Sequence, residues 1–171
     1  MDVLEAIAER RSIRSYTGEH VSDAQVDVLV RAGQDAPSAG NLQARDFIVV
    51  RDATTKKRLA MASLGQVQVE RADVLIVVCA NVPRSSSRYG KRGTLYAHQD
   101  AAASVQNMLI AAHALGLGAC WVGAFDEHEV GHILGVPVNV VPCAIITVGV
   151  PAEKPKKPRR FTTENVHVEV W

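Results

Sequence analysis

The chain has 171 residues, of which 47% are hydrophobic and 22% charged, so it is long enough for one compact domain with its own core. Its formal net charge is only +1, which gives no overall electrostatic reason to expect a nucleic acid or a membrane surface as partner. A site for an anion must therefore come from a local cluster of basic residues.

Apolar periodicity predicts five helices and five strands, and no repeat is visible along the chain. Residues 38–41 and the Ser-, Arg- and Gly-rich residues 83–93 are expected to be loops. The helices are expected at residues 2–9, from the N-cap Ser22 to 37, through 59–64, at 94–115 and at 127–134, and the strands at residues 47–51, 74–80, 119–122, 144–150 and 166–171.

The order of these elements favours an α+β layered domain, because no glycine-rich phosphate loop follows the first strand as it would in a doubly wound sheet. Residues 1–171 form a single domain in this interpretation, with residues 151–171 as an extended C-terminal arm. The last strand has no hairpin partner, so we expect it to pair with another chain. An alanine stripe on helix 94–115 is typical of two helices in a dimer core, or alternatively of a central helix packed within one subunit.

Cys79, Cys120 and Cys143 stand in apolar runs without a C-x-x-C pair, which gives neither a disulfide framework nor a zinc site. We expect buried free thiols in a reducing compartment. Met1 leads directly into a charged amphipathic segment and not into a signal peptide, so a cytoplasmic location is expected.

Basic residues cluster at two places that are far apart in the sequence, residues 10–14 and the tail at residues 154–160. If residues 10–14 are extended, Ser12 and Arg14 point one way and Ile13 points into the core, while Arg10 and Arg11 can turn to the same point. Guanidinium groups bind phosphate oxygens in pairs, so this cluster suits a phosphate dianion. Alternatively, these arginines only complement a helix C-terminus, and the basic residues of the tail only solubilise a linker.

Two further segments carry weaker signals. A strand ends at the small residues Gly123 and Ala124, where little side chain would separate the backbone from a planar ligand. His128 and His132 match the zinc-protease pattern H-E-x-x-H, but helical geometry places them opposite the apolar face, so we expect them to face solvent and not a cleft. No metal site is expected, although a zinc hydrolase based on this pair is the alternative that a chelator would test.

Four ordered segments give the chain a resemblance to the nitroreductase family of FMN-dependent enzymes. The segments are R-R-S-I-R at 10–14, A-P-S-A-G-N-L-Q at 36–43, the central helix region 100–118, and the closing segment 151–167. The resemblance implies a three-layer fold with a mixed, mainly antiparallel sheet, a C-terminal strand exchanged between subunits, and a homodimer with FMN at its interface.

The resemblance also implies roles for individual residues. The phosphate would be held by the basic cluster and the tail, the flavin would be reached by a loop of the partner subunit, and residues near the end of the strand 119–122 would line the isoalloxazine. Gln66 would contact its pyrimidine side. The implied FMN-binding residues are Arg10, Arg11, Ser12, Arg14, Pro37, Ser38, Ala39, Asn41, Gln66, Val122, Gly123, Ala124, and Lys157, Arg159 or Arg160 from the tail.

The family usually has Pro-Trp after the residue equivalent to Gln43, whereas this chain has Ala44 and Arg45. A positive charge near the flavin entrance would alter the choice of substrate. The chain is also too short for the helical lid of larger members, which leaves residues 84–91 as the candidate lid.

The implied reaction takes hydride from NAD(P)H and reduces nitroaromatics, quinones or related electron-poor acceptors by a ping-pong mechanism at the flavin, without a catalytic side chain. A specialised enzyme of the same fold, such as a dehalogenase or a flavin-fragmenting enzyme, is an alternative. A non-catalytic flavin-binding module is another.

Overall fold

The computed structural model describes residues 1–161, 163 and 165–171. Its centre is a four-stranded antiparallel sheet in the order β1-β2-β4-β3. The strands are β1 (Arg45–Val50), β2 (Val74–Asn81), β3 (Gly118–Val122) and β4 (Val140–Gly149).

Helices surround this sheet, and five of the seven α-helices of the described chain begin at a residue whose side chain accepts a hydrogen bond from the first turn. For example, the Ser22 side chain accepts from the backbone of Gln25 while the Gln25 side chain accepts from Ser22, which is a complete capping box. The helices are α1 (Val3–Glu9), α2 (Asp23–Gln34), α3 (Ala53–Ala62), α4 (Val67–Arg71), α5 (Val82–Tyr89), α6 (Gly93–Ala114) and α7 (Glu127–Leu134), with short 3-10 turns η1 (Ala39–Asn41) and η2 (Gly90–Arg92).

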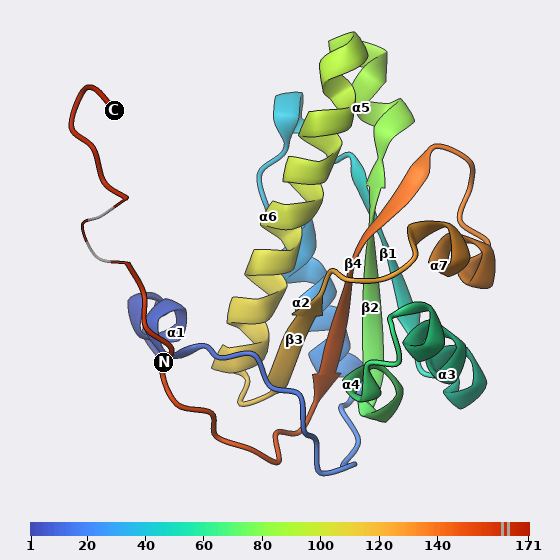
Figure 1. The fold of residues 1–171 in the computed structure, drawn as a ribbon, viewed down its shortest axis with the longest axis vertical. Coiled ribbons are helices and arrows are strands. Elements are labelled where there is room, and N and C mark those ends of the chain that lie inside the picture. Colours follow the sequence, from blue (N-terminus) through green and yellow to red (C-terminus); the bar gives the residue numbers. More distant parts are fainter. Residues whose placement is uncertain (162, 164) are drawn as a thin grey trace.

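The molecule has three layers, with α2 and α6 on one face of the sheet and α3, α4 and α7 on the other (Figure 1). Strand β2 is buried along almost its whole length because both of its faces are covered. Val74, Ile76 and Val78 pack toward α2 and α6, and Leu75 and Val77 pack toward the opposite layer. The fold class is therefore the layered α+β domain that the sequence predicts.

Helix α6 is the central element of one layer. Ala101, Ser104 and Ala112 are buried within the subunit, and α6 contacts α2 and all four strands. This part of the alanine stripe thus serves close packing inside one chain, which is the second of the two interpretations given above.

Several expected boundaries were wrong. Residues 83–93 are not a loop, because Asn81 caps a helix that has Pro83 in its first turn and Ser85 buried against α6. Helix α4 was not expected, and β4 begins earlier than expected. Residues 166–171 are in no strand of this chain, and their expected pairing with another chain stays a prediction.

The arm that follows β4 runs without regular structure beside α1 and then leaves the layers (Figure 1). Apolar side chains near its end are exposed, including Val168 and Trp171. Within the described residues, no helix combines the length and the apolarity that crossing a bilayer requires.

Candidate functional site

Residues 10–14 leave the end of α1 as an extended segment that lies along β3. Ser12 forms a parallel bridge with Ala119, and the N–H of Ile13 donates to the carbonyl of Ala119 at 3.0 Å. The Ile13 side chain packs against Gly118, where an added Cβ would come within 2.7 Å of it. Ser12 and Arg14 consequently point away from the core on the other side, as the alternation predicts.

Residues 10–14, the Arg-rich segment, and the C-terminal arm enclose a cavity of about 300 Å³. It is lined by Arg10, Arg11, Ser12, Arg14, Pro155, Lys156, Pro158 and Arg160. In the described part of the chain, no carboxylate lies within ion-pair distance of Arg10, Arg14 or Arg160. Burial and the nearby guanidinium groups of Arg160 and Arg11 lower the pKa of Arg10. Arg11 pairs with Glu9 at 4.0 Å, so the positive charge that is left without a carboxylate here is that of Arg10, Arg14 and Arg160.

The arm contributes Pro155 to this cavity and, from Lys156 onward, every second residue. Lys156, Pro158 and Arg160 line it, whereas Lys157 lines a different cavity and Arg159 lines neither. An extended chain turns successive side chains to opposite sides, which explains this division. Of the three tail residues implied by the resemblance, the structure brings only Arg160 to the Arg10 cluster.

A second group of predicted residues meets beyond the end of β3. The side-chain amide of Gln66 donates to the carbonyl of Ala124 at 3.0 Å, which joins the start of α4 to this turn. Gly123 and Ala124 are exposed, and a Cβ added to Gly123 would meet only the Trp121 side chain, at 3.6 Å. The turn thus presents open backbone next to an amide side chain.

Residues 37–43 form a strained loop at the other end of the molecule. Gly40, Asn41 and Gln43 all have positive φ, at 58°, 56° and 51°. The buried carboxylate of Asp100 accepts from the N–H of Ala39 at 2.9 Å and faces the N–H of Ala44 at 3.4 Å. A residue other than glycine keeps a left-handed backbone conformation only where its surroundings stabilise it. The hydrogen bonds to Asp100 therefore stabilise this loop.

We call the cavity lined by Arg10 and Arg160 the phosphate-sized cavity. The loop is remote from it within the same chain. Asp100, which holds the loop, and His113, which lies near the Arg-rich segment, are 13 residues apart on α6, or roughly 20 Å at 1.5 Å per residue. One subunit therefore does not bring Pro37, Ser38, Ala39 and Asn41 together with the other predicted site residues.

Arg45 does not place a charge at an entrance, so that expectation was wrong. It is 4% exposed, and its guanidinium donates to the carbonyls of Gln34 at 2.6 Å and Ala36 at 2.7 Å. The last carbonyls of a helix lack hydrogen-bond donors within the helix, and the Arg45 guanidinium provides these donors at the end of α2.

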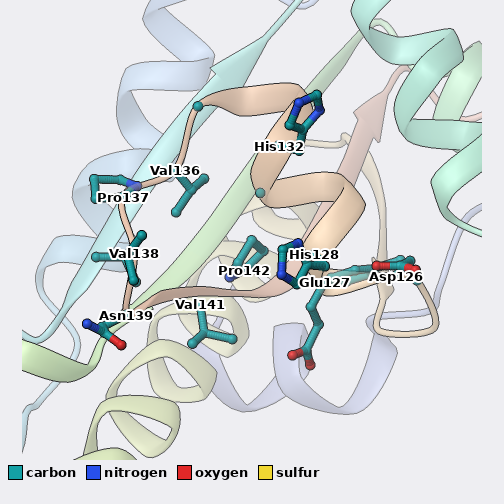
Figure 2. Close-up of a pocket in the computed structure, with 14 residues that line it drawn as sticks. Asp126, Glu127, His128, His132, Val136, Pro137, Val138, Asn139, Val141 and Pro142 are labelled. Carbon is teal, nitrogen blue, oxygen red and sulfur yellow. The ribbon is translucent and has the colours of Figure 1, made fainter.

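His128 and His132 are exposed on α7, and Val130 between them is buried, as the helical geometry predicts. They nevertheless border an open groove of about 890 Å³ between α7 and residues 135–142, so the expectation that they avoid any cleft was wrong (Figure 2). The walls of the groove include Val136, Val138 and Pro142. Among the residues that the structure describes, no three metal-binding side chains gather here or elsewhere.

The sequence interpretation placed Lys156 in the basic tail but not among the FMN-binding residues, and it gave no role to Asp100 or Glu153. The Glu153 carboxylate accepts from the N–H of Arg14 and, at 3.1 Å, from that of Ser15, which ties the arm to the Arg-rich segment. Alternation along the arm could have placed Lys156 with Arg160. A single acid in an alanine-rich helix was the only signal for Asp100.

Comparison with known proteins identifies the family. The model of the family described as the nitroreductase family matches residues 7–73 and 68–150. The chain belongs to the nitroreductase family. A relative from Archaeoglobus fulgidus is 33% identical over 177 residues, which covers 99% of each protein. The Bacillus subtilis protein named FMN reductase [NAD(P)H] is 31% identical over 99% of this chain and 74% of its own length.

Solved structures of nitroreductase-like proteins have the same fold. B. megaterium NfrA2 superposes with a TM-score of 0.92 and 30% identity, over 100% of this chain and 76% of its own. The NADPH:FMN oxidoreductase from Vibrio harveyi, solved with NAD+, superposes with a TM-score of 0.91 and 28% identity, over 99% of this chain and 77% of its own.

Proposed function

We propose that this nitroreductase-family chain is an FMN-dependent oxidoreductase that takes hydride from NAD(P)H and reduces nitroaromatics, quinones or related electron-poor acceptors. The observation that carries the proposal is the unneutralised cationic cavity around Arg10. A phosphate monoester supplies the two negative charges and the several acceptor oxygens that this set of donors lacks.

The residues present fit FMN at both ends of the proposed site. Arg10, Arg14 and Arg160 would hold the phosphate, with the Ser12 hydroxyl as a further donor. The exposed backbone of Gly123 and Ala124 would lie against the isoalloxazine, and the Gln66 amide would contact its pyrimidine edge. Bound FMN supplies the redox chemistry, accepting hydride from NAD(P)H and passing the reducing equivalents to the acceptor in a second half-reaction, so the kinetics are ping-pong.

The chain's own residues bind and orient the cofactor and do not act as nucleophile or general acid. The thiol nearest the Arg-rich segment is Cys120, and burial raises its pKa although Arg14 and Ser12 oppose the shift. It is therefore a protonated, buried side chain at neutral pH.

We further propose that the active unit is a cytoplasmic homodimer. The strained loop at residues 37–43 lies far from the cationic cavity of its own chain, so it would reach the flavin of a partner. A two-fold axis would place this loop of each subunit at the other subunit's site, because the same surfaces meet on both sides of such an interface. The exposed apolar end of the arm is the segment that we expect to pair with the partner's sheet.

An absorbance experiment tests the proposal. We expect the purified protein, alone or after incubation with FMN, to show flavin absorbance bands that bleach when NADH or NADPH is added without oxygen. Addition of a quinone or nitroaromatic should then restore the bands. A protein that stays colourless after incubation with FMN would contradict the proposal, and a yellow protein that neither nucleotide bleaches would reduce it to a flavin-binding module.

A further inference from the structure

Helix α5, the turn η2 and the start of α6 carry a basic surface that the proposed flavin site does not use. Residues 74–99 contain no Asp or Glu, whereas four cations stand close together there, at Arg84, Arg88, Lys91 and Arg92. These elements project beyond the sheet at the top of Figure 1. Because the net charge of the whole chain is only +1, this surface is a local concentration of charge.

Most of this charge has no acidic partner. Arg84 is neutralised, because its guanidinium donates to the Asp46 carboxylate at 2.9 Å. Arg88, Lys91 and Arg92 are exposed, and within the described part of the chain no carboxylate lies within ion-pair distance of them. These three side chains are therefore free to bind an anion.

Two tyrosine rings hold the guanidinium groups in place. Tyr89 and Tyr96 meet edge to face, with their ring centroids 4.9 Å apart. The Arg88 guanidinium lies 5.6 Å from the Tyr89 centroid, and that of Arg92 lies 5.2 Å from the Tyr96 centroid and donates to the Tyr96 hydroxyl at 2.9 Å. A guanidinium that is already positioned loses less conformational entropy when it binds an anion. We call Arg88, Lys91, Arg92 and the two tyrosines the α5 patch.

The α5 patch lies against the loop at residues 37–43. A Cβ added to Gly40 would collide with the Tyr89 hydroxyl and come within 2.9 Å of a terminal nitrogen of the Arg88 guanidinium. In the proposed homodimer this loop reaches the flavin of the partner. The patch then stands beside the route by which substrates reach that flavin.

The charge of the patch discriminates among the substrates of the proposed function. Quinones and nitroaromatics carry no phosphate, and NADH carries only its pyrophosphate, whose two phosphates are diesters. NADPH has in addition a phosphate monoester on its adenosine ribose, and such a group carries a charge of about −1.5 to −2 at pH 7. A monoester dianion is the group that two positioned guanidinium forks and an ammonium bind best.

We propose that the α5 patch binds the 2′-phosphate of NADPH, so that the protein prefers NADPH to NADH. The proposal rests on the proposed flavin function and its homodimer. Arg88 and Arg92 donate to the phosphate oxygens, Lys91 adds a further positive charge, and the nicotinamide end of the same molecule extends toward the partner's flavin.

Isothermal titration calorimetry tests the proposal on the full-length protein after incubation with FMN. The probes are adenosine 2′,5′-bisphosphate and 5′-AMP, which differ only in the 2′-phosphate and transfer no hydride. For the wild type we expect the Kd for the bisphosphate to be at least about tenfold below that for 5′-AMP, since one charge-assisted hydrogen bond contributes that much. The double variant Arg88→Ala with Arg92→Ala should lose this difference.

The double variant Lys57→Ala with Arg58→Ala is the matched control. It removes the same charge from exposed positions on α3, which covers the other face of the sheet, and should keep the wild-type difference. Bleaching of bound FMN gives a second readout: at low nucleotide concentration the Arg88 and Arg92 variant should be reduced at least about tenfold more slowly by NADPH and at the wild-type rate by NADH.

Two results would overturn the proposal. One is a wild-type protein with equal Kd values for the two probes, and the other is a patch variant that keeps the wild-type difference or weakens both probes equally. A protein that binds no FMN, or whose FMN neither nucleotide bleaches, would instead contradict the proposed function, because the probe titration does not depend on hydride transfer.

Discussion

The guanidinium of Arg10 is held beside other positive charges, and a bound anion would offset their repulsion. It is partly buried beside Arg11 and Arg160, and these like charges together with burial lower its pKa. A cluster of this kind destabilises the protein without a ligand, because the guanidinium groups repel one another at short range. Binding an anion removes that cost and adds charge-assisted hydrogen bonds.

Replacing Arg10 and Arg14 together with alanine should therefore weaken FMN binding by roughly two orders of magnitude or more, at about 1.5–3 kcal/mol for each charged hydrogen-bonding group. Equilibrium dialysis of the variant against FMN measures the loss. Arg31→Ala with Arg58→Ala removes the same charge from exposed positions outside the cavity and serves as control. Equal FMN affinity in the two double variants would refute the phosphate assignment.

Asp73 is the residue whose ionisation should govern acid stability. Burial alone would raise its pKa, but the N–H of Val21 and the guanidinium of Arg51, at 3.0 and 2.7 Å, outweigh burial and lower it below the ordinary 3.8. A carboxyl with a lowered folded-state pKa stabilises the fold above its unfolded pKa, and this contribution disappears as the pH falls through the folded value.

We therefore expect Asp73→Asn to lose about 1–3 kcal/mol of unfolding free energy at pH 7, and the difference from the wild type to shrink below about pH 4. Urea unfolding across this pH range gives the comparison. Asp23→Asn is the control, because Asp23 pairs with the same Arg51 but its side chain is 89% exposed, and such pairs contribute little. A constant difference at every pH would show that the charge of Asp73 is not the cause.

At the scale of elements, periodicity predicted most helices and strands because their apolar faces are regular. Helix α7 was predicted with the bounds observed, and α6 and β2 within one residue at each end. The prediction of α5 failed because the composition around Ser85 is typical of a loop. The contact between α5 and α6, where Ser85 is buried, decides the conformation. Residue patterns predicted the cationic cavity. The contact of Asp100 with residues 39–44 depends on packing between distant segments, so the pattern could single out Asp100 but not its partners.

The arm gives a prediction that depends on its extended conformation. Lys156→Ala and Arg160→Ala should each raise the Kd for FMN several-fold more than Lys157→Ala and Arg159→Ala, because alternate residues face the phosphate-sized cavity. All four variants change the charge equally, so a non-directional electrostatic effect would give four equal losses. That result, measured by fluorescence titration, would contradict the alternation.

At the scale of the whole molecule, the exposed apolar end of the arm is the part of the chain that tests the proposed homodimer. Val166, Val168 and Val170 alternate along the sequence and are all exposed. Removing residues 166–171 should shift the protein from dimer to monomer in light scattering, and replacing these three valines with serine should do the same. Val138→Ser, at an equally exposed valine on another surface, should leave the mass unchanged. A stable dimer without residues 166–171 would mean that the arm does not hold the subunits together.

The closure of the arm onto the first extended segment also bears on how the protein is made. The bond from the backbone of Arg14 to Glu153 joins positions 139 residues apart, and Arg160 is later still. Contacts of such long sequence separation form late and slow the folding of small domains. The phosphate-sized cavity needs both Arg10 and Arg160, so a site that starts near the beginning of the chain is complete only after residue 160 has been synthesised.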